Sequence, residues 1–267
     1  MVWSWRNGAG ELTELQMPNY LVTSYDGFSQ TPVRLQTQKS PYQHGTTLID
    51  TLLEPRYCNL ILVIAARTKA EKLEKRRELI RAFSPRLGVG KLTWEQEEGQ
   101  EYSLKAIAEE APVMPSGAEG VVHQEVIVNF MAPDPTFYSP EKELIELDSS
   151  ATARANVYNQ GDTETPVFIT VDGACEEPKI TNLSTGHEIV LEDVEITAGE
   201  RIEINTKYGI KKISHVNEDG HRSNLLGKMH HDSVLFYLQP GNNQIDFRSL
   251  TGEPMVEFEF NHRYAGI

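Results

Sequence analysis

Residues 57–66 read YCNLILVIAA, a dense apolar run bounded by Pro55 and Arg67. Ile, Leu and Val supply most of it, and these residues favour strands. The run is too short for a membrane span, and its length and composition are typical of a central strand that is buried on both faces. It therefore predicts a sheet in the first half of the chain, with residues 57–66 near its middle.

A helix is predicted directly after this strand. Thr68 and Glu71 have the spacing of a capping box, in which the two side chains satisfy backbone N–H groups of the first turn. Ser84-Pro85 ends the helix, because the residue before a proline avoids the helical conformation. The helical period predicts that one apolar face carries Ala70, Leu73, Ile80 and Phe83.

The same helix carries the densest basic stretch of the chain, namely Lys72, Lys75, Arg76, Arg77 and Arg81. One interpretation is a solvated helix face on which these residues pair with Glu71, Glu74 and Glu78. The other is an interface with an acidic neighbouring subunit. We take the five basic residues as the candidate interface residues of this sequence.

Further strands are predicted on both sides of this strand and helix. Residues 20–37 alternate apolar and polar side chains around Tyr25-Asp26-Gly27-Phe28, which predicts two short strands joined by a turn. Strands are also expected at 91–95, 100–108 and 121–131. A loop rich in Pro, Gly and Ser at 112–120 is expected to project from a hairpin.

The second half is predicted to be a separate β domain. Three prolines in residues 132–140, APDPTFYSP, stiffen a linker, so the boundary is placed after Pro140. Beyond residue 151 short strands recur between Gly, Asn and Pro turns, of which Pro240-Gly241-Asn242-Asn243 is the clearest, and this is typical of a sandwich or jelly roll. The strands are expected at 167–171, 179–183, 187–191, 201–205, 210–214, 233–238, 244–248 and 255–260.

Charge and composition exclude several classes of function. The formal net charge is −14, and residues 141–267 carry 22 acidic against 11 basic side chains. Because nucleic-acid binding depends on Lys and Arg, a dedicated DNA or RNA binder is not expected, although an acidic wall lets DNA pass without adhering. The two cysteines suggest neither a disulfide framework nor a zinc site. With no signal peptide and no membrane span in the sequence, we expect a protein made in the cytoplasm.

The sequence contains no recognisable catalytic motif, and we predict no catalytic residue, no metal ligand and no cofactor. His230-His231-Asp232 is the nearest approach to a site, but neighbours on a strand point to opposite faces and do not readily share a metal. The acidic pairs are interpreted as solvating charges rather than glycosidase carboxylates. They are Glu97-Glu98, Glu109-Glu110 and Glu176-Glu177. Two interpretations apply to the aromatic residues Tyr208, Phe236, Tyr237 and Tyr264. They form a sugar-stacking platform or, as is more usual for aromatic residues, they pack in the core and in interfaces.

The order of these features resembles the distal tail proteins of long-tailed, siphovirus-type bacteriophages. Strand, capped helix, Pro/Gly stop, strands and the segment APDPTFY at 132–138 resemble the N-terminal belt domain of that family. NQGD at 159–162, PKITN at 178–182 and LQPGNN at 238–243 resemble its C-terminal β-sandwich. One departure is Asn205, where an acidic residue is expected. The chain also has no room for the sugar-binding modules that enlarged members carry.

The resemblance implies a mainly β fold in two domains. Residues 1–140 would form a ring-forming β-sandwich or belt domain with one α-helix, and residues 141–267 a galectin-like jelly-roll β-sandwich. It implies a homohexameric ring at the tail tip of the virion, between the tail tube protein and the tail hub and receptor-binding proteins. Genomic DNA would pass through the ring. The strands at 57–66 and 121–131 are expected to pair between subunits, because a ring completes open sheet edges.

Two other functions stay open at this point. One is a carbohydrate-binding adhesion module of a virion or cell surface, which residues 141–267 alone would provide. The other is a hydrolase acting on cell wall, in which Glu97, Glu98 or His231 would be essential.

Overall fold

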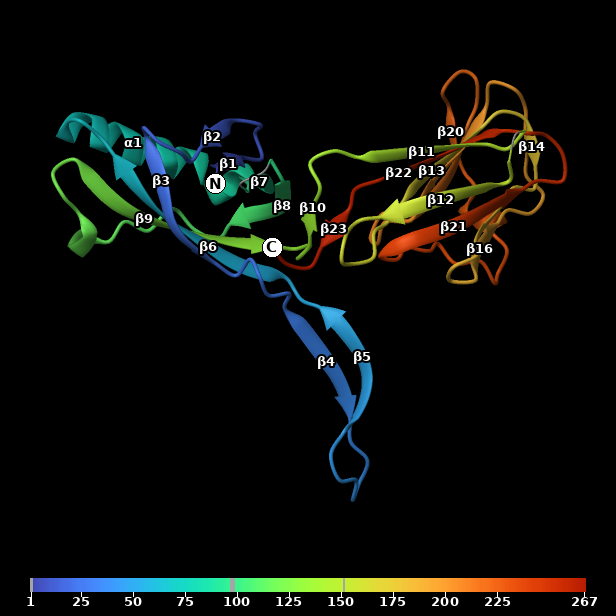
Figure 1. Cartoon of the computed structure of the whole chain (residues 1–267), viewed down its shortest axis with the longest axis horizontal. Coiled ribbons are helices and arrows are strands. Elements are labelled where there is room, and N and C mark those ends of the chain that lie inside the picture. Colours follow the sequence, from blue (N-terminus) through green and yellow to red (C-terminus); the bar gives the residue numbers. More distant parts are fainter. Residues whose placement is uncertain (1, 97–98, 151) are drawn as a thin grey trace. The chain divides into compact units, whose positions relative to one another are not determined.

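The structure, a computed structural model, describes residues 2–96, 99–150 and 152–267. The chain divides into two compact units, which are unit 1 (Met1–Pro140 with Tyr264–Ile267) and unit 2 (Glu141–Arg263). The fold is mainly β with a single α-helix in the described residues, which confirms the predicted fold class (Figure 1). None of the described helices has the length and apolar character needed to cross a bilayer.

The core of unit 1 is built on one sheet with the strand order β2-β1-β7-β8-β9-β6-β3, and the short β10 pairs with β8. Its strands are β1 (Val2–Arg6), β2 (Leu12–Glu14), β3 (Tyr20–Asp26), β6 (Arg56–Ala65), β7 (Gly90–Glu95), β8 (Glu101–Ala108), β9 (His123–Ala132) and β10 (Phe137–Tyr138). A hairpin of β4 (Val33–Gln38) and β5 (Thr47–Leu53) forms a separate two-stranded sheet. The 3-10 helices η1 (Pro85–Leu87) and η2 (Ser116–Ala118) lie in connections. The final strand, β23 (Arg263–Tyr264), brings the chain back to unit 1.

Strand β6 is central, as its sequence predicts, and it pairs with β9 on one side and β3 on the other. Cys58, Leu60, Leu62 and Ile64 point into the core and are at most 5 % exposed. The opposite face is only half-buried, and its first residue, Tyr57, is exposed. The expectation that both faces are buried was wrong, because this antiparallel sheet buries one face fully.

Helix α1 (Lys69–Ala82) begins with the predicted capping box. The Thr68 hydroxyl accepts a hydrogen bond from the Glu71 N–H, and the Glu71 carboxylate accepts one from the Arg67 N–H. The predicted apolar face was correct only for Phe83, which is buried. Ala70, Leu73 and Ile80 are exposed, and the face turned to the sheet carries Lys72, Lys75, Leu79 and Ala82.

Strands β3 and β4 both exist, but the prediction that a turn pairs them was wrong. β3 pairs with β6, and β4 pairs with β5. Gly27 ends β3 with φ +83°, and a Cβ there would lie 2.3 Å from the Tyr57 carbonyl oxygen, so only glycine fits this close approach. The loop at 112–120 also differs from prediction. It runs back along β9 through the bridges Val113 to Ile127 and Glu119 to Gln124 instead of projecting.

Unit 2 is a β-sandwich of a six-stranded and a four-stranded sheet around one core. The first sheet has the order β11-β22-β13-β18-β19-β20. Its strands are β11 (Glu143–Asp148), β13 (Phe168–Asp172), β18 (Arg201–Asn205), β19 (Lys212–Val216), β20 (Arg222–Asn224) and β22 (Met255–Phe260). The second, β12-β21-β15-β16, consists of β12 (Arg154–Asn159), β15 (Lys179–Asn182), β16 (His187–Val190) and β21 (Gly241–Arg248). A small third sheet pairs β14 (Cys175–Glu176) with β17 (Glu195–Ile196). A 3-10 helix, η3 (Leu226–Lys228), precedes the His230-His231-Asp232 segment.

Two predictions in unit 2 need correction. Residues 233–238 are not a strand, and only Leu238 forms a bridge, with Thr165. The turn predicted at 240–243 is shorter, because Gly241, Asn242 and Asn243 already belong to β21. The buried Asn243 side chain holds this turn instead, by accepting from the Gln239 N–H and donating to the Gln239 carbonyl.

Each unit contains one buried cysteine, and this gives a separate unfolding probe for each. Burial raises the pKa of Cys58 in unit 1 to about 12 and that of Cys175 in unit 2 to about 11. A raised pKa lowers the thiolate fraction, by roughly 1,000-fold for Cys58 near pH 8. We expect both thiols to resist labelling by a disulfide reagent until their own unit unfolds. Mass spectrometry of labelled peptides across a urea series measures this, and rapid labelling of either thiol without urea would contradict the buried positions.

Candidate assembly interface

The β4–β5 hairpin, hereafter the arm, presents an apolar face to solvent. All thirteen residues of its two strands are exposed. The strand register places the side chains of Val33, Leu35, Leu48 and Leu53 on one face, where each is at least 46 % exposed. The opposite face carries Arg34, Gln36, Gln38 and Asp50 with Leu52. The arm is therefore an amphipathic ribbon with an exposed apolar side, and it extends away from the ends of β3 and β6 (Figure 1).

A hairpin with an exposed apolar face gains stability when a partner covers that face. Isolated two-stranded hairpins are marginally stable in water. Contiguous exposed apolar surface typically marks a protein interface. Burying the four aliphatic side chains against another protein would contribute roughly 25 cal/mol for each Å² removed from water. The arm is accordingly the strongest candidate interface in the described part of the chain.

A buried arginine fixes the root of the arm. Arg56, the first residue of β6, is 1 % exposed, and backbone carbonyls surround its guanidinium. It donates to the carbonyls of the segment between β3 and the arm, namely Gly27 (2.7 Å), Phe28 (3.1 Å) and Gln30 (2.7 Å). It also donates to the carbonyls of Pro135 (2.6 Å) and Ala265.

The Arg56 guanidinium also lies 4.8 Å from the centre of the Phe137 ring, a cation–π distance. Burial lowers the pKa of this guanidinium, although arginine remains protonated in proteins. One side chain thus connects the arm root, the proline-rich segment and the C-terminal residues of unit 1. Sequence patterns gave no sign of this role.

The strands predicted to pair between subunits are already paired within the chain. β6 has partners on both sides, and β9 pairs with β6 along its whole length and with β8 at its end. Bridges from the 112–120 loop cover the remaining edge of β9. This expectation was wrong, and the longer open edge of the unit 1 sheet is that of β3. On β3 Leu21 is 48 % exposed.

The basic residues of α1 do not form one exposed surface. Lys72 is 1 % exposed, and its ammonium donates to the Glu119 carboxylate (2.6 Å) and the Gly120 carbonyl (2.7 Å). Lys75 is also buried. The solvated-face interpretation is wrong in that both lysines are buried, although Lys75 forms the predicted ion pair with Glu71 (2.8 Å). Their ammonium groups are bonded inside the chain and not presented on an exposed surface. For Arg76, which is half-buried, and for the exposed Arg77 and Arg81, an interface remains a prediction.

The pair of Lys72 and Glu119 allows a test of charge burial. We expect Lys72→Met to change stability little, because an apolar chain of similar length can replace a buried ion pair. Glu119→Gln is expected to lower stability more, since it leaves the buried ammonium without its anion. Urea unfolding of both variants, followed by fluorescence, measures the order. A larger loss for Lys72→Met would contradict the argument.

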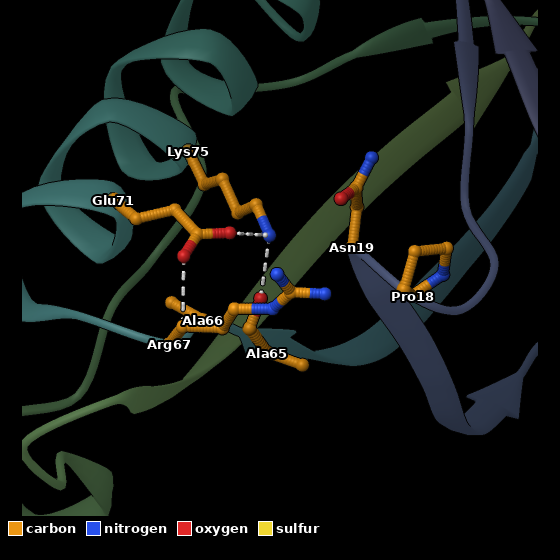
Figure 2. Close-up of a pocket in the computed structure, with 7 residues that line it drawn as sticks. All are labelled: Pro18, Asn19, Ala65, Ala66, Arg67, Glu71 and Lys75. Atoms are coloured by element: carbon orange, nitrogen blue, oxygen red, sulfur yellow. Dashed lines mark hydrogen bonds and ion pairs between the residues drawn. The ribbon is translucent and has the colours of Figure 1, made fainter.

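A pocket of about 390 Å³ lies beside the start of α1 (Figure 2). Its lining residues are Pro18, Asn19, Ala65, Ala66, Arg67, Glu71 and Lys75. The Lys75 ammonium lies 2.8 Å from the Glu71 carboxylate and donates to the Ala65 carbonyl. The hydrogen bonds from Lys75 and from the Arg67 N–H lower the pKa of Glu71. These charges neutralise one another, and the lining offers no nucleophile beside a base, so the arrangement supports the helix start rather than chemistry.

The other candidate groups are dispersed. Phe236 is buried in the core of unit 2, and Tyr264 packs edge-on against Tyr102 in unit 1, so the four aromatic residues form no common platform. Tyr208 and Tyr237 are joined by a hydrogen bond from the Tyr208 N–H to the Tyr237 hydroxyl.

The acidic pairs make contacts within turns and strand ends. Glu110 accepts a hydrogen bond from the Asn129 amide, and Glu177 accepts one from the Asp193 N–H. Glu97 and Glu98 lie outside the described residues. His230, His231 and Asp232 do come together, but in a turn and not on a strand, so the reason for which a shared metal was excluded was wrong.

Comparison with known proteins agrees with this architecture. A family model described as the siphovirus-type tail component, C-terminal domain, matches residues 160–264. A second, described as the phage tail protein RIFT-related domain, matches residues 13–130. Together they define the chain as a phage tail component. No match was found among curated proteins.

Solved structures extend the match over both units. The crystal structure of the SPP1 Dit protein, described as a paradigm of the hub adsorption apparatus in phages infecting Gram-positive bacteria, has a TM-score of 0.70 at 14% identity. It covers 98% of this chain and 99% of its own. The phage p2 baseplate in its activated conformation matches with strontium (TM-score 0.57, 8% identity, 100% and 99% covered) and with calcium (0.55, 11%, 100% and 100%). The chain belongs to the siphovirus distal tail protein family.

Proposed function

We propose that this chain forms a homohexameric ring at the tip of the phage tail, as a structural protein of the virion without catalytic activity. The ring joins the tail tube protein on one side to the tail hub and host-recognition proteins on the other. Genomic DNA passes through its lumen without specific binding. The family and the baseplate context of its structural relatives support a tail-tip role.

The observation that carries the proposal is the exposed apolar face of the arm. In a ring each arm packs this face on the neighbouring copy, which buries Val33, Leu35, Leu48 and Leu53 in every subunit. Arg56 fixes the arm root, so the arm presents this face in a defined direction. The net charge of −14 gives the assembly an acidic character, which disfavours adhesion of DNA.

Mass photometry of the full-length chain at micromolar concentration tests the ring. The wild type is expected at about six times the 30.1 kDa chain mass. The double variant Leu35→Asp with Leu48→Asp is expected to remain monomeric, because two charges on the apolar face forbid its burial. Its fold should be retained, since every residue of the two arm strands is exposed.

A matched control changes the opposite face by the same net charge. Arg34→Gln with Gln38→Asp removes one positive charge and adds one negative charge, so the net charge of the arm also falls by two, but on its polar side, and we expect the oligomer to persist. The proposal would be wrong if the wild type stayed monomeric even in a mixture with tail-tube and hub proteins. If both double variants assemble as the wild type does, the arm is not the contact between subunits.

A further inference from the structure

Two histidines and an aspartate converge in one turn of unit 2. One ring nitrogen of His230, one of His231 and a carboxylate oxygen of Asp232 all lie within 4.8 Å of one another. His231 Nε2 is 3.3 Å and His230 Nδ1 is 3.9 Å from Asp232 Oδ2. Ligands of a tetrahedral zinc ion at about 2.0–2.1 Å are separated by about 3.3 Å. Small rotations of exposed side chains therefore suffice to close the set on one ion.

The turn that carries these side chains is fastened to the sandwich. The His230 N–H donates to the Val190 carbonyl at the end of β16 (2.9 Å), and the Ser233 hydroxyl accepts from the Val190 N–H (2.9 Å). Within the turn the Ser233 N–H donates to the His230 carbonyl (3.0 Å). These hydrogen bonds fix the backbone that carries the three side chains. Metal binding therefore costs little backbone conformational entropy.

The surroundings of His230 suit a metal ligand. Its Nδ1 accepts a hydrogen bond from the Asp232 N–H (3.2 Å), so Nδ1 carries the lone pair that a metal ion would use. Its other nitrogen, Nε2, lies 3.8 Å from the Glu192 carboxylate, which is beyond hydrogen-bond distance, and a small rotation of the exposed Glu192 side chain would bring the two into contact. A carboxylate beside the distal nitrogen fixes the tautomer and orientation of a metal-bound imidazole. Coordination through Nδ1 would release the Asp232 N–H to water at this exposed turn.

We propose that His230, His231 and Asp232 bind a divalent transition-metal ion such as Zn²⁺, with water in the remaining position and Glu192 as the positioning residue. Two imidazoles and one carboxylate suit zinc, cobalt or nickel rather than calcium or magnesium, which prefer oxygen ligands. The bound ion ties the turn into a closed chelate and stabilises unit 2, because it binds the folded state selectively. This site is independent of the ring contact.

Metal titration of the full-length, untagged and metal-stripped chain tests the site. Calorimetry with Zn²⁺ is expected to show one equivalent, and Co²⁺ is expected to give the absorption spectrum of a nitrogen- and oxygen-ligated ion. His231→Gln should weaken binding at least about tenfold and Glu192→Gln by about tenfold, as for lost ligands and their supporting partners. Zn²⁺ should raise the melting temperature of the wild type but not of His231→Gln.

His221→Gln is the matched control, since His221 is an exposed histidine outside the cluster. It should bind Zn²⁺ as the wild type does, which separates a built site from ordinary surface histidines. His231→Gln should melt like the wild type without metal, because the His231 side chain is 81 % exposed. Absence of Zn²⁺ binding by the wild type, or equal binding by the His230→Gln, His231→Gln and His221→Gln variants, would overturn the proposal.

Discussion

Replacing Arg56 with methionine is expected to lower the free energy of unfolding of unit 1 by about 3–5 kcal/mol. Methionine fills part of the volume but donates no hydrogen bond, so the carbonyls around the guanidinium lose their donor. Part of this cost is offset, because a charge no longer has to be buried. Urea unfolding followed by tryptophan fluorescence measures unit 1 alone, since Trp3, Trp5 and Trp94 all lie in it.

Arg34→Met is the matched control for Arg56→Met. The Arg34 side chain is 72 % exposed and its nearest carboxylate, that of Glu54, lies 3.9 Å away. Exposed pairs of this kind contribute little, so we expect a change below about 0.5 kcal/mol. Arg56→Lys should fall between the two, because an ammonium donates fewer hydrogen bonds than the planar guanidinium. If Arg56→Met and Arg34→Met unfold alike, Arg56 does not fix the arm root.

The sequence predicted those parts of the fold that depend on neighbouring residues. The apolar run at 57–66 predicted the central strand β6, because strand preference and burial act on consecutive residues. Thr68 and Glu71 predicted the start of α1, since a capping box joins side chain and backbone within one turn. Most strands of unit 2 were predicted for the same reason. These signals are local, and so are the elements that they define.

Features that depend on distant partners could not be predicted in this way. Lys72 can be buried because its ammonium pairs with the carboxylate of Glu119, which lies 47 residues away in the sequence. A helical period cannot indicate such a distant partner. The acceptors of Arg56 come from segments up to 209 residues away. The error on His230 and His231 had another cause. The alternation rule was applied to residues that lie in a turn, where it does not hold.

The arm depends both on local sequence and on contacts with distant residues. Strand β4 falls almost wholly within the alternating residues 20–37, whereas β5, which has no strict alternation, was not predicted. The apolar face of the arm is exposed in the described structure, so its burial requires a second molecule. Arg56 links the arm to unit 1 through the backbone carbonyls of Gly27, Phe28 and Gln30. Loss of Arg56 should therefore weaken both the stability of unit 1 and the assembly that we propose, whereas charges on the arm face should affect assembly alone.

Asn243→Leu is expected to lower the free energy of unfolding of unit 2 by about 2–4 kcal/mol. Asn243 is fully buried, and its carbonyl oxygen accepts hydrogen bonds from the Gln239 N–H (2.9 Å) and from the Asn182 amide (3.1 Å). Leucine has the same branched arrangement of side-chain heavy atoms, so the site stays filled while the buried Asn182 amide and the part-buried Gln239 N–H lose their acceptor. Each such donor costs about 1–3 kcal/mol when left without a partner.

Labelling of Cys175 along a urea series measures this loss, because that thiol is buried in unit 2. The midpoint of Cys175 labelling should shift to lower urea, while the tryptophan fluorescence transition of unit 1 should keep its position. Asn242→Leu is the control, since Asn242 is the exposed neighbour in the same strand and its loss leaves no buried donor without an acceptor. Equal shifts for both asparagine variants would mean that turn propensity, not the buried amide of Asn243, holds this end of the sandwich.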